Sequence, residues 1–444
     1  MKDLTKGNIY KTFFLFGLPL VLSGLLSQTY HVIDTAIAGQ FIGETALAAM
    51  GATGPLISFL SSLIWGYGVG FSIYIARLYS SGKHENITSA VYTTVFLLFV
   101  FCAFIAFFSI LFHDQLFDIL QIKQELRADA YEYFFFYILG LFFILFPAFG
   151  LYIMNSFGIG SFPFFMSLVS AVLNITGNIV SVTVLGWGIK GLAISTVFSA
   201  GVVSVCYVFK FFSCLKEMGV SKKGKLGFAY LRNSLPFSLP NMFQQGVMYF
   251  ASLGISPLVN AIGVSAAASY SVVSQVMNIN TSVYQNSART VSNYTAQCVG
   301  SNQHEKINKG VLVGLLQGIA FVLPFVLVCS IFHKPVCDIF IKADADALTR
   351  EYSYLFASTY LPFIFINLVC NLFHGLFRGV KASGHLFVTT FVGAISRLIY
   401  SWLLIPSMGM SGFFLGWVLS WVTEAVLCVV LFFLGGWKTK EHTV

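Results

Sequence analysis

The chain carries little charge for its length. Only 9% of its 444 residues are Asp, Glu, Lys or Arg, whereas about a quarter are charged in a typical soluble domain. Hydrophobic residues make up 57% of the chain, and the mean hydropathy is +0.82. Such a composition cannot supply a water-facing surface. It therefore excludes a soluble globular protein and predicts a chain that lies mostly within a membrane.

Signatures of nucleotide binding and covalent catalysis are also missing. The sequence contains no Walker A motif, no dinucleotide-binding fingerprint and no nucleophile elbow. Its eight cysteines form no C-x-x-C pair, and its eight histidines are scattered, mostly over predicted loops. We therefore expect no cofactor, no metal site and no ATP-driven step in this chain. The cysteines are interpreted as small packing residues.

What the sequence does contain is a series of apolar runs near or above the roughly 20 residues that span a bilayer. They lack the period-two alternation of barrel strands, so the predicted fold is an all-α polytopic membrane protein. No cleavable signal peptide is expected, because the first run is too long and lacks a small-residue cleavage site. Twelve transmembrane helices are predicted, over residues 10–41, 45–78, 87–112, 130–156, 162–185, 190–214, 232–260, 263–299, 307–333, 350–378, 384–406 and 410–436.

The placement of positive charge predicts the topology. With the N-terminus in the cytoplasm, seventeen Lys and Arg residues fall in inner loops or at inner helix ends, and six fall outside. The reverse orientation would violate the positive-inside rule, so both termini are expected in the cytoplasm. The formal charge of +8 is dispersed over the inner loops. This pattern favours contact with membrane lipid rather than with nucleic acid.

The second half of the chain resembles the first at an offset of about 220 residues. The clearest matches, in the same order in both halves, are Leu18-Pro19 with Leu235-Pro236, His84-Glu85 with His304-Glu305, and Gly188-Ile189-Lys190-Gly191 with Gly409-Met410-Ser411-Gly412. Each half holds six predicted helices, so both halves enter the membrane in the same direction. We expect two six-helix lobes, 1–215 and 232–444, related by a pseudo-two-fold axis along the membrane normal. Residues 216–231 would form a cytoplasmic linker between them.

Asp34 is the acidic residue of the first apolar run. A carboxylate at membrane depth is costly and usually marks an ion or substrate pathway. Ser23, Ser27 and Tyr30 precede it at spacings of four, three and four residues, so all four side chains share one helix face. Pro19 removes a backbone donor below them and is predicted to act as a hinge.

Two asparagines of the predicted helix 162–185, Asn174 and Asn178, also share one face, and Thr196 lies early in the next helix. In the predicted topology these groups can converge on Asp34 in the outer half of the N-terminal lobe. The four residues are therefore predicted to form a cation-coupling site. The alternative is that the polar groups only join helices, at about 1 kcal/mol per hydrogen bond.

A second polar stripe follows the predicted helix 263–299 at spacings of three and four residues. It is interpreted as the wall of a wetted cavity, with helix packing as the alternative. The predicted substrate cavity comprises Tyr30, Asn155, Gln275, Asn278, Ser282 and Gln285. Arg397 and Glu424 fall at similar depth in the last two predicted helices. They are predicted to form a structural ion pair, since buried charges in membranes typically pair.

Two passages carry a resemblance to a known family. Leu18-Pro19-Leu20, Asp34-Thr35 and Gly43-Glu44-Thr45-Ala46-Leu47-Ala48-Ala49 stand in the first, and Leu173-Asn174 and Gly188-Ile189-Lys190-Gly191-Leu192-Ala193-Ile194-Ser195-Thr196 in the second. Together with the repeat, they resemble the bacterial multidrug and toxic compound extrusion (MATE) transporters over essentially the whole chain. The resemblance implies a cation-coupled antiporter rather than an enzyme. It would act as a monomer in the bacterial inner (plasma) membrane.

The resemblance also implies a mechanism. Members of the family export organic cations and other amphipathic drugs in exchange for inward H⁺ or Na⁺, by alternating access. Their coupling site places an acid, an Asn and a Thr where this chain has Asp34, Asn174 and Thr196. Asn178 replaces a second acid, which leaves less charge to hold Na⁺ and favours H⁺. One branch of the family has a cation site in the C-terminal lobe, with acids in the seventh and tenth helices. This chain has Gln244 and Asn367 in those regions, so it is similar to the branch that resembles DNA-damage-inducible protein F.

Two other functions stay open at this stage. Arg289 and Arg397 can line a cationic cavity suited to a pyrophosphate, as in a lipid-linked oligosaccharide flippase of the same superfamily. A membrane-embedded enzyme is the third possibility, and it would need an acid–base or metal cluster at membrane depth. Twelve rather than fourteen helices and the Asp34 pattern favour the drug exporters over the flippase. The scattered histidines argue against the enzyme.

Overall fold

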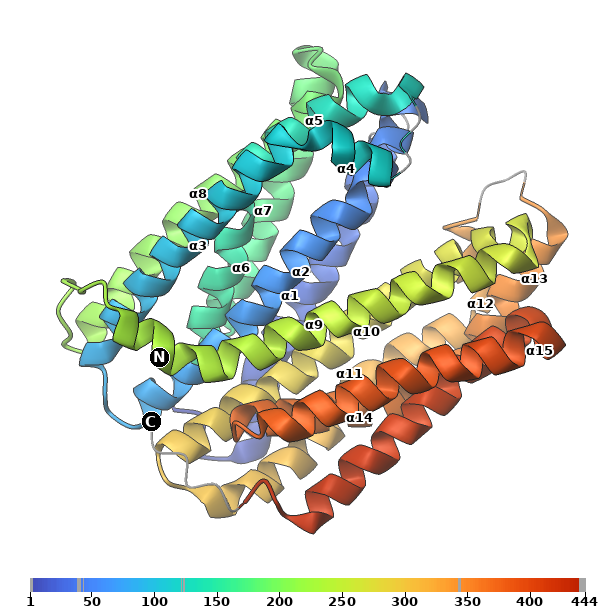
Figure 1. The fold of residues 1–444 in the computed structure, drawn as a ribbon. Coiled ribbons are helices and arrows are strands. Elements are labelled where there is room, and N and C mark those ends of the chain that lie inside the picture. The colour runs from blue at the N-terminus through green and yellow to red at the C-terminus, as the bar shows by residue number, and fades with distance from the viewer. Residues whose placement is uncertain are drawn as a thin grey trace. The chain divides into compact units, whose positions relative to one another are not determined.

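The computed structural model describes residues 3–37, 41–42, 44–120, 122, 124–341 and 345–438. Within these ranges the regular elements are helices and none is a strand, which confirms the predicted all-α class (Figure 1). The first half forms α1 (Ile9–Ile37), α2 (Glu44–Ser80), α3 (Glu85–Leu111), α4 (His113–Ile119), η2 (Gln124–Leu126), α5 (Arg127–Leu139), α6 (Leu141–Ser156), α7 (Ser161–Ile179), η3 (Val180–Val184) and α8 (Gly188–Glu217).

The second half repeats this order with small differences. It forms α9 (Phe228–Ile262), α10 (Val264–Gly300), η4 (His304–Lys306), α11 (Ile307–Ile331), α12 (His333–Asp338), α13 (Ala347–Leu355), η5 (Phe356–Tyr360), η6 (Leu361–Phe363), α14 (Ile364–Gly379) and α15 (Ser383–Leu434). Here η3 and η5 are π-helical turns, and η2, η4 and η6 are 3₁₀ turns.

Over the residues that the structure describes, each of the twelve predicted segments corresponds to helix. Eight described helices are long and apolar enough to cross a membrane, or nine if a pair bent by 50° between Gln124–Leu139 and Leu141–Ser156 counts as one span. The count falls short of twelve for two reasons. α15 holds two predicted spans joined at Gly409, where the backbone leaves the helical conformation. α9 and α10 are not among the apolar helices over their described residues, and the polar stripe of α10 lowers the hydropathy of that helix.

The internal repeat is visible in matched local structures. Gly188 and Gly409 have φ of +57° and +56°, so both turns use a conformation that favours glycine. An ion pair also recurs after the third long helix of each half. Asp118 pairs with Arg127 in the first half, and Asp338 accepts from Arg350 over 2.8 Å in the second. These matches confirm that the two halves are copies of one helical design.

Two compact units divide the chain, and their boundaries differ from the predicted lobes. Unit 1 comprises Leu26–Met242, and unit 2 comprises Asp3–Leu25 with Phe243–Val444. The predicted boundaries at 215 and 232 therefore need correction, because α1 and α9 each contribute to both units. The first part of α1 belongs to unit 2, where Gln317 Nε2 donates to the Phe13 carbonyl over 2.8 Å. The Phe13 and Tyr294 rings also pack edge to face there, with centroids 4.9 Å apart.

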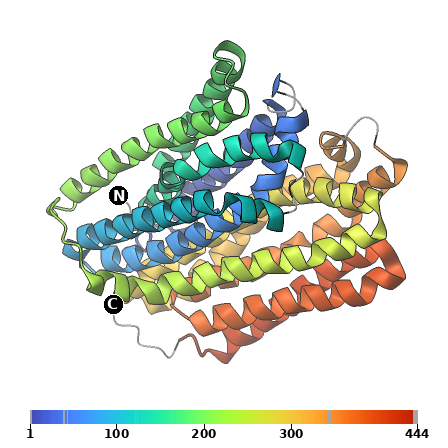
Figure 2. The ribbon, with the colours of Figure 1, turned by 45° about the horizontal axis from the view of Figure 1, so that its top comes forward.

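The segment between α8 and α9 packs against the start of α3 in unit 1. Tyr92 donates to the Lys222 carbonyl over 2.7 Å, and the amides of Lys225 and Gly227 donate to Ser89 and Thr93 over 3.0 and 3.2 Å. The predicted linker thus has a defined course along unit 1. In unit 2, α10 packs against α11 and α14, and α14 packs against α15, as the views in Figures 1 and 2 both show.

Candidate functional site

Asp34 lies near the end of α1, in the part of that helix that belongs to unit 1. Its side chain is half-buried, and Asn178 of α7 donates from Nδ2 to its Oδ1 over 2.6 Å. Asn178 is 0% exposed and Asn174 is 2% exposed. The Asp34 carboxylate is therefore held by the polar face of α7 that carries Asn174 and Asn178. The spacing of the two asparagines predicts this face.

The two asparagines and Thr196 form a chain of hydrogen bonds with one direction. The Thr196 hydroxyl donates to the Leu192 carbonyl over 2.9 Å, so its oxygen is left to accept from Asn174 Nδ2 over 3.1 Å. Asn174 then presents its amide oxygen to Asn178 Nδ2, at 3.3 Å. An amide nitrogen carries two N–H donors. One N–H of Asn178 faces Asn174, and the other donates to Asp34. Through Asn174, Thr196 thus orients the Asn178 amide so that its N–H group points at the Asp34 carboxylate.

Asn178 also carries an acceptor that this chain of bonds does not use. Its Oδ1 is buried and accepts no hydrogen bond from any residue that the structure describes. A buried amide oxygen without a donor costs about 1–3 kcal/mol. The side chain therefore offers an oxygen that can accept a proton donor or contact a cation beside Asp34.

Aromatic and apolar residues close the rest of this site within unit 1. Tyr133 and Tyr137 of α5 form a tilted ring pair with centroids 5.7 Å apart, and both lie in the neighbourhood of Asp34. Ile37 and Leu192 form a buried apolar cluster next to it. Sequence reasoning missed both tyrosines, although their spacing of four residues within a Phe-rich helix is a signal of a shared face.

Helix α7 departs from α-helical geometry directly after Ile179, one residue beyond Asn178. The π-helical turn η3 covers Val180–Val184, and such turns occur frequently at functional sites. Ser181 within η3 lies 3.2 Å from Ser195 of α8, hydroxyl to hydroxyl. This contact fastens the end of α7 to α8 close to the asparagine pair, so the donors that face Asp34 are held by packing on both sides.

The predicted cavity residues are placed in several environments. In unit 2, Gln275 and Asn278 of α10 are exposed, and Gln285 is half-buried. Tyr30 of α1 is half-buried, in unit 1 with Asp34. The predicted hinge, Pro19, lies within an unbroken α1, and Ser23 donates to its carbonyl over 2.8 Å.

Two of the predicted cavity residues need correction. Asn155 is 1% exposed, because α6 packs against α2 and α8 around it, so it does not line an open cavity. Ser282 is 8% exposed because α1 packs against it at Gly24, where a β-carbon would collide with the Ser282 hydroxyl. Helical spacing placed both on a polar face, but it did not show which part of the face another helix covers.

The predicted ion pair between Arg397 and Glu424 is also wrong. Within the described residues, Glu424 contacts His374, with Oε1 3.4 Å from Nε2. The Arg397 guanidinium instead lies over the Trp417 ring, 5.8 Å from its centroid. Equal depth in neighbouring helices does not fix the direction of a side chain around the helix axis, and a third helix, α14, supplies the partner of Glu424.

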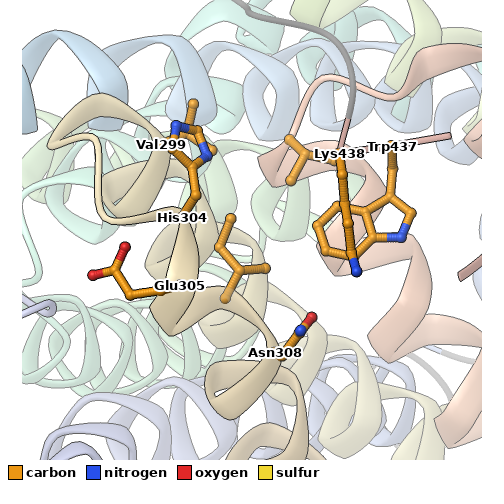
Figure 3. Close-up of a pocket in the computed structure, with 8 residues that line it drawn as sticks. Val299, His304, Glu305, Asn308, Trp437 and Lys438 are labelled. Carbon is orange, nitrogen blue, oxygen red and sulfur yellow. The ribbon is translucent and has the colours of Figure 1, made fainter. Parts of the chain in front are cut away.

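A pocket of about 310 Å³ lies at one end of unit 2 (Figure 3). His304 and Glu305 come from η4, and Asn308 comes from the start of α11. Trp437 and Lys438 face them from the turn after α15, as the close-up shows. None of the predicted site residues lines this pocket, so it does not contribute to the site around Asp34.

Comparison with known proteins gives the same family over both halves of the chain. The MatE family model matches residues 19–180 and 240–403. The chain is 23% identical to "Probable multidrug resistance protein YpnP" of Bacillus subtilis (strain 168), over 99% of this chain and 98% of that protein. It is 25% identical to "Probable multidrug resistance protein YoeA" of the same organism, over 76% and 74%. A "FAD transporter" of Shewanella oneidensis is 21% identical over 77% of each chain.

Solved structures share the fold. The outward-facing conformation of a multidrug resistance MATE family transporter of the MOP superfamily superposes with a TM-score of 0.90 at 19% identity, over 98% of each chain. A MOP superfamily transporter from Pyrococcus furiosus gives a TM-score of 0.91 at 18% identity, over 99% of this chain and 98% of that one. The family match covers most of the sequence and both repeats, and the chain therefore belongs to the MatE family of multidrug efflux transporters.

Proposed function

We propose that this transporter exports organic cations or amphipathic drugs in exchange for inward H⁺, with Asp34 as the group that carries the proton. It would act as a monomer, in contact with membrane lipid, in the inner membrane of a bacterium with both termini in the cytoplasm. The names of the relatives YpnP and YoeA support drugs as substrates. The excess of Lys and Arg in the predicted inner loops supports the orientation.

One observation supports H⁺ as the coupling ion: the Asn178 amide has a nitrogen that donates to Asp34 and a buried oxygen that accepts no hydrogen bond among the described residues. As a carboxylate, Asp34 accepts from Asn178 Nδ2 but cannot donate to the buried Oδ1, which has no donor among the described residues. A protonated Asp34 gains a hydroxyl donor. It can then bond to the oxygen as well as the nitrogen of the same amide. Protonation would therefore satisfy a buried acceptor that is unsatisfied in this structure.

Helix α1 offers a route from protonation to conformational change. It is one continuous helix whose first part belongs to unit 2 and whose last part, with Asp34, belongs to unit 1. Pro19 removes one helical hydrogen bond within it and is the predicted hinge. In the proposed cycle, proton capture from outside changes how Asp34 holds α1 against α7 and releases the substrate. Reorientation then exposes Asp34 to the cytoplasm, where the proton leaves.

The membrane potential can drive this cycle. Inward movement of one charge through 100 mV supplies about 2.3 kcal/mol, and a pH gradient adds about 1.4 kcal/mol per pH unit. No second energy source is needed in the proposed cycle. The coupling then depends on one side chain, which makes it testable by one substitution.

The test is transport in proteoliposomes with the pH and Na⁺ gradients clamped independently. Wild-type protein should export tetraphenylphosphonium when only a pH gradient is present, and Asp34→Asn should lose both this export and the coupled proton uptake. Asp114→Asn is the matched control, because Asp114 is an exposed acid with a side-chain exposure of 68%. Export and proton uptake that survive in Asp34→Asn would reject the proposal.

Na⁺ is the second candidate for the coupling ion. The unsatisfied Asn178 oxygen next to a carboxylate is a ligand pair that an alkali cation can also use. Two oxygens with one negative charge are few for a site that must replace the hydration of Na⁺. In the clamped assay, export driven by a Na⁺ gradient alone would favour this candidate over H⁺.

A lipid-linked oligosaccharide flippase is the alternative function. The name of the FAD transporter among the relatives shows that a phosphate-bearing substrate occurs in this group of proteins. The two arginines that would bind a pyrophosphate are Arg289, which donates to Asn286 over 2.9 Å, and Arg397 over Trp417. Binding of a lipid pyrophosphate by the purified protein, with no binding of tetraphenylphosphonium, would favour the flippase.

A further inference from the structure

A buried titratable pair lies in unit 2, and the proposed transport cycle makes no use of it. Glu424, in the second part of α15, is 5% exposed, and His374 of α14 is 4% exposed. Their side chains approach to 3.4 Å between Oε1 and Nε2. A buried charge within a membrane helix is costly and usually functional, so the state of this pair needs a physical account.

The hydrogen bonds around His374 fix the position of its proton. Arg378 Nη2 donates to Gln244 Oε1 over 2.7 Å. Arginine has only donors, so the amide oxygen of Gln244 must face it, and the amide nitrogen must face His374. That nitrogen lies 3.2 Å from His374 Nδ1. Because an amide nitrogen only donates, Nδ1 must accept, and neutral His374 carries its proton on Nε2.

The Nε2–H group then points at two oxygens. It lies 3.0 Å from the Thr389 hydroxyl and 3.4 Å from Glu424 Oε1. Thr389 donates its own proton to the His385 carbonyl over 2.8 Å, so its oxygen accepts from the imidazole. A second proton on Nδ1 of His374 would place donor against donor at Gln244. The exchangeable proton of the pair therefore belongs on Glu424.

We propose that Glu424 is a proton-binding site of unit 2, separate from Asp34, and that His374 is its positioning residue. In the ionised state, the carboxylate has the imidazole N–H as its direct polar contact in the described part of the chain. In the protonated state, the group is neutral, and the cost of a buried charge is removed. The ligand is a single proton, which passes between Glu424 and water when unit 2 is hydrated.

Packing around the carboxyl group supports a dedicated site. A β-carbon at Gly393 would lie 2.7 Å from Glu424 Cδ and 2.8 Å from Oε2. Gly393, in the first part of α15 before the break at Gly409, thus leaves the space that the Glu424 carboxyl group fills from the second part. The repeat supplies no counterpart, because the offset between Gly188 and Gly409 places Val203 at the position of Glu424. The site is a feature of the second half alone.

Apart from His374, the charged groups near Glu424 do not pair with it within the described residues. The titratable and charged side chains on the surrounding helices are Tyr284 of α10, Cys370, His374 and Arg378 of α14, and Arg397 and Cys428 of α15. Arg378 contacts Gln244, and Arg397 lies over Trp417. A cation in the neighbourhood favours an ionised carboxylate, while burial favours the protonated form. This balance lets one proton bind and leave.

Infrared difference spectroscopy of the purified full-length protein tests the site directly. Spectra from about pH 5 to about pH 8 cover the range in which solvent-exposed acids are largely ionised. We expect a pH-dependent carboxylic acid band that persists in Asp34→Asn and disappears in Asp34→Asn/Glu424→Gln. A band that is absent from Asp34→Asn, or that survives in the double variant, would overturn the inference. If the double variant does not fold, Glu424→Asp in the Asp34→Asn background must move the band, and an unmoved band has the same meaning.

Two substitutions at His374 test its positioning role. His374→Gln keeps an N–H donor that can reach Glu424, whereas His374→Leu removes it. Without the donor, the protonated Glu424 band should persist to a higher pH in the Leu variant than in the Gln variant. Equal titration curves in the two folded variants would reject the positioning role. The Asp34 band is read separately, so loss of either signal alone shows whether the site of unit 1 or that of unit 2 has failed.

Discussion

The Thr196 hydroxyl accepts a hydrogen bond from Asn174 Nδ2 over 3.1 Å, at the far end of the bonds that reach Asp34. Thr196→Val keeps the shape but removes this acceptor, so the Asn174 amide is free to turn its nitrogen toward Asn178. We expect proton-coupled export to fall about fivefold, the effect of losing roughly 1 kcal/mol. Thr196→Ser restores the hydroxyl and should export like wild type. Equal rates for the Val and Ser variants would show that Thr196 does not orient the site.

Asn178→Asp places a second carboxylate against the first. Two adjacent carboxylates disfavour each other's ionised form, and together they supply the charge that the wild-type site lacks for an alkali cation. We expect Na⁺ to stimulate export by this variant, at a clamped neutral pH, more than export by wild type. Asn178→Leu is the uncharged control and should lose export without gaining a response to Na⁺. A variant that ignores Na⁺ would show that charge alone does not decide the coupling ion.

The sequence predicted the helices and the meeting of four polar residues for a clear physical reason. Spacings of three and four residues place Asn174 and Asn178 on one face, and a lone acid such as Asp34 in an apolar helix needs polar neighbours. The structure brings these residues together with Thr196. Their role in coupling stays a prediction.

Other features could not be read from periodicity. The spacing of four residues places Tyr133 and Tyr137 on one face of α5, but nothing within that phenylalanine-rich helix shows that this face turns toward Asp34. The partner of Glu424 depends on how α14 is turned against α15, which no spacing within α15 contains. The division of α1 between two units depends on contacts such as that of Gln317 with the Phe13 carbonyl, more than three hundred residues away along the chain.

The attachment of the segment between α8 and α9 to α3 can be tested by limited proteolysis. Ser89 and Thr93 accept hydrogen bonds from the amides of Lys225 and Gly227. Ser89→Ala with Thr93→Val removes both acceptors, at about 1 kcal/mol each. Local opening should then become about thirtyfold more frequent, and trypsin should cut at the exposed Lys222 and Lys223 faster by a similar factor. Ser109→Ala, at the other end of α3, is the control, and cleavage at the wild-type rate in the double variant would contradict the attachment.

Gly393 provides a stability test of the Glu424 site that needs no transport. Alanine at this position would bring a methyl group within 2.7 Å of the Glu424 carboxyl carbon, so the carboxyl group must move away from His374 or the helix must bend. Overpacking of this kind costs about 1–3 kcal/mol. Gly393→Ala should therefore lower the thermal unfolding temperature of the purified protein, and the titratable Glu424 band should shift in the same sample.

Gly201 of α8 is the matched control for that substitution. A β-carbon there would meet nothing within 4 Å, and alanine is favoured over glycine in a helix interior by up to about 1 kcal/mol. Gly201→Ala should therefore leave the unfolding temperature unchanged or raise it. If Gly393→Ala is as stable as Gly201→Ala and leaves the band in place, then the space beside Glu424 is larger than the structure shows. In that case His374 does not hold the carboxyl group in a fixed position.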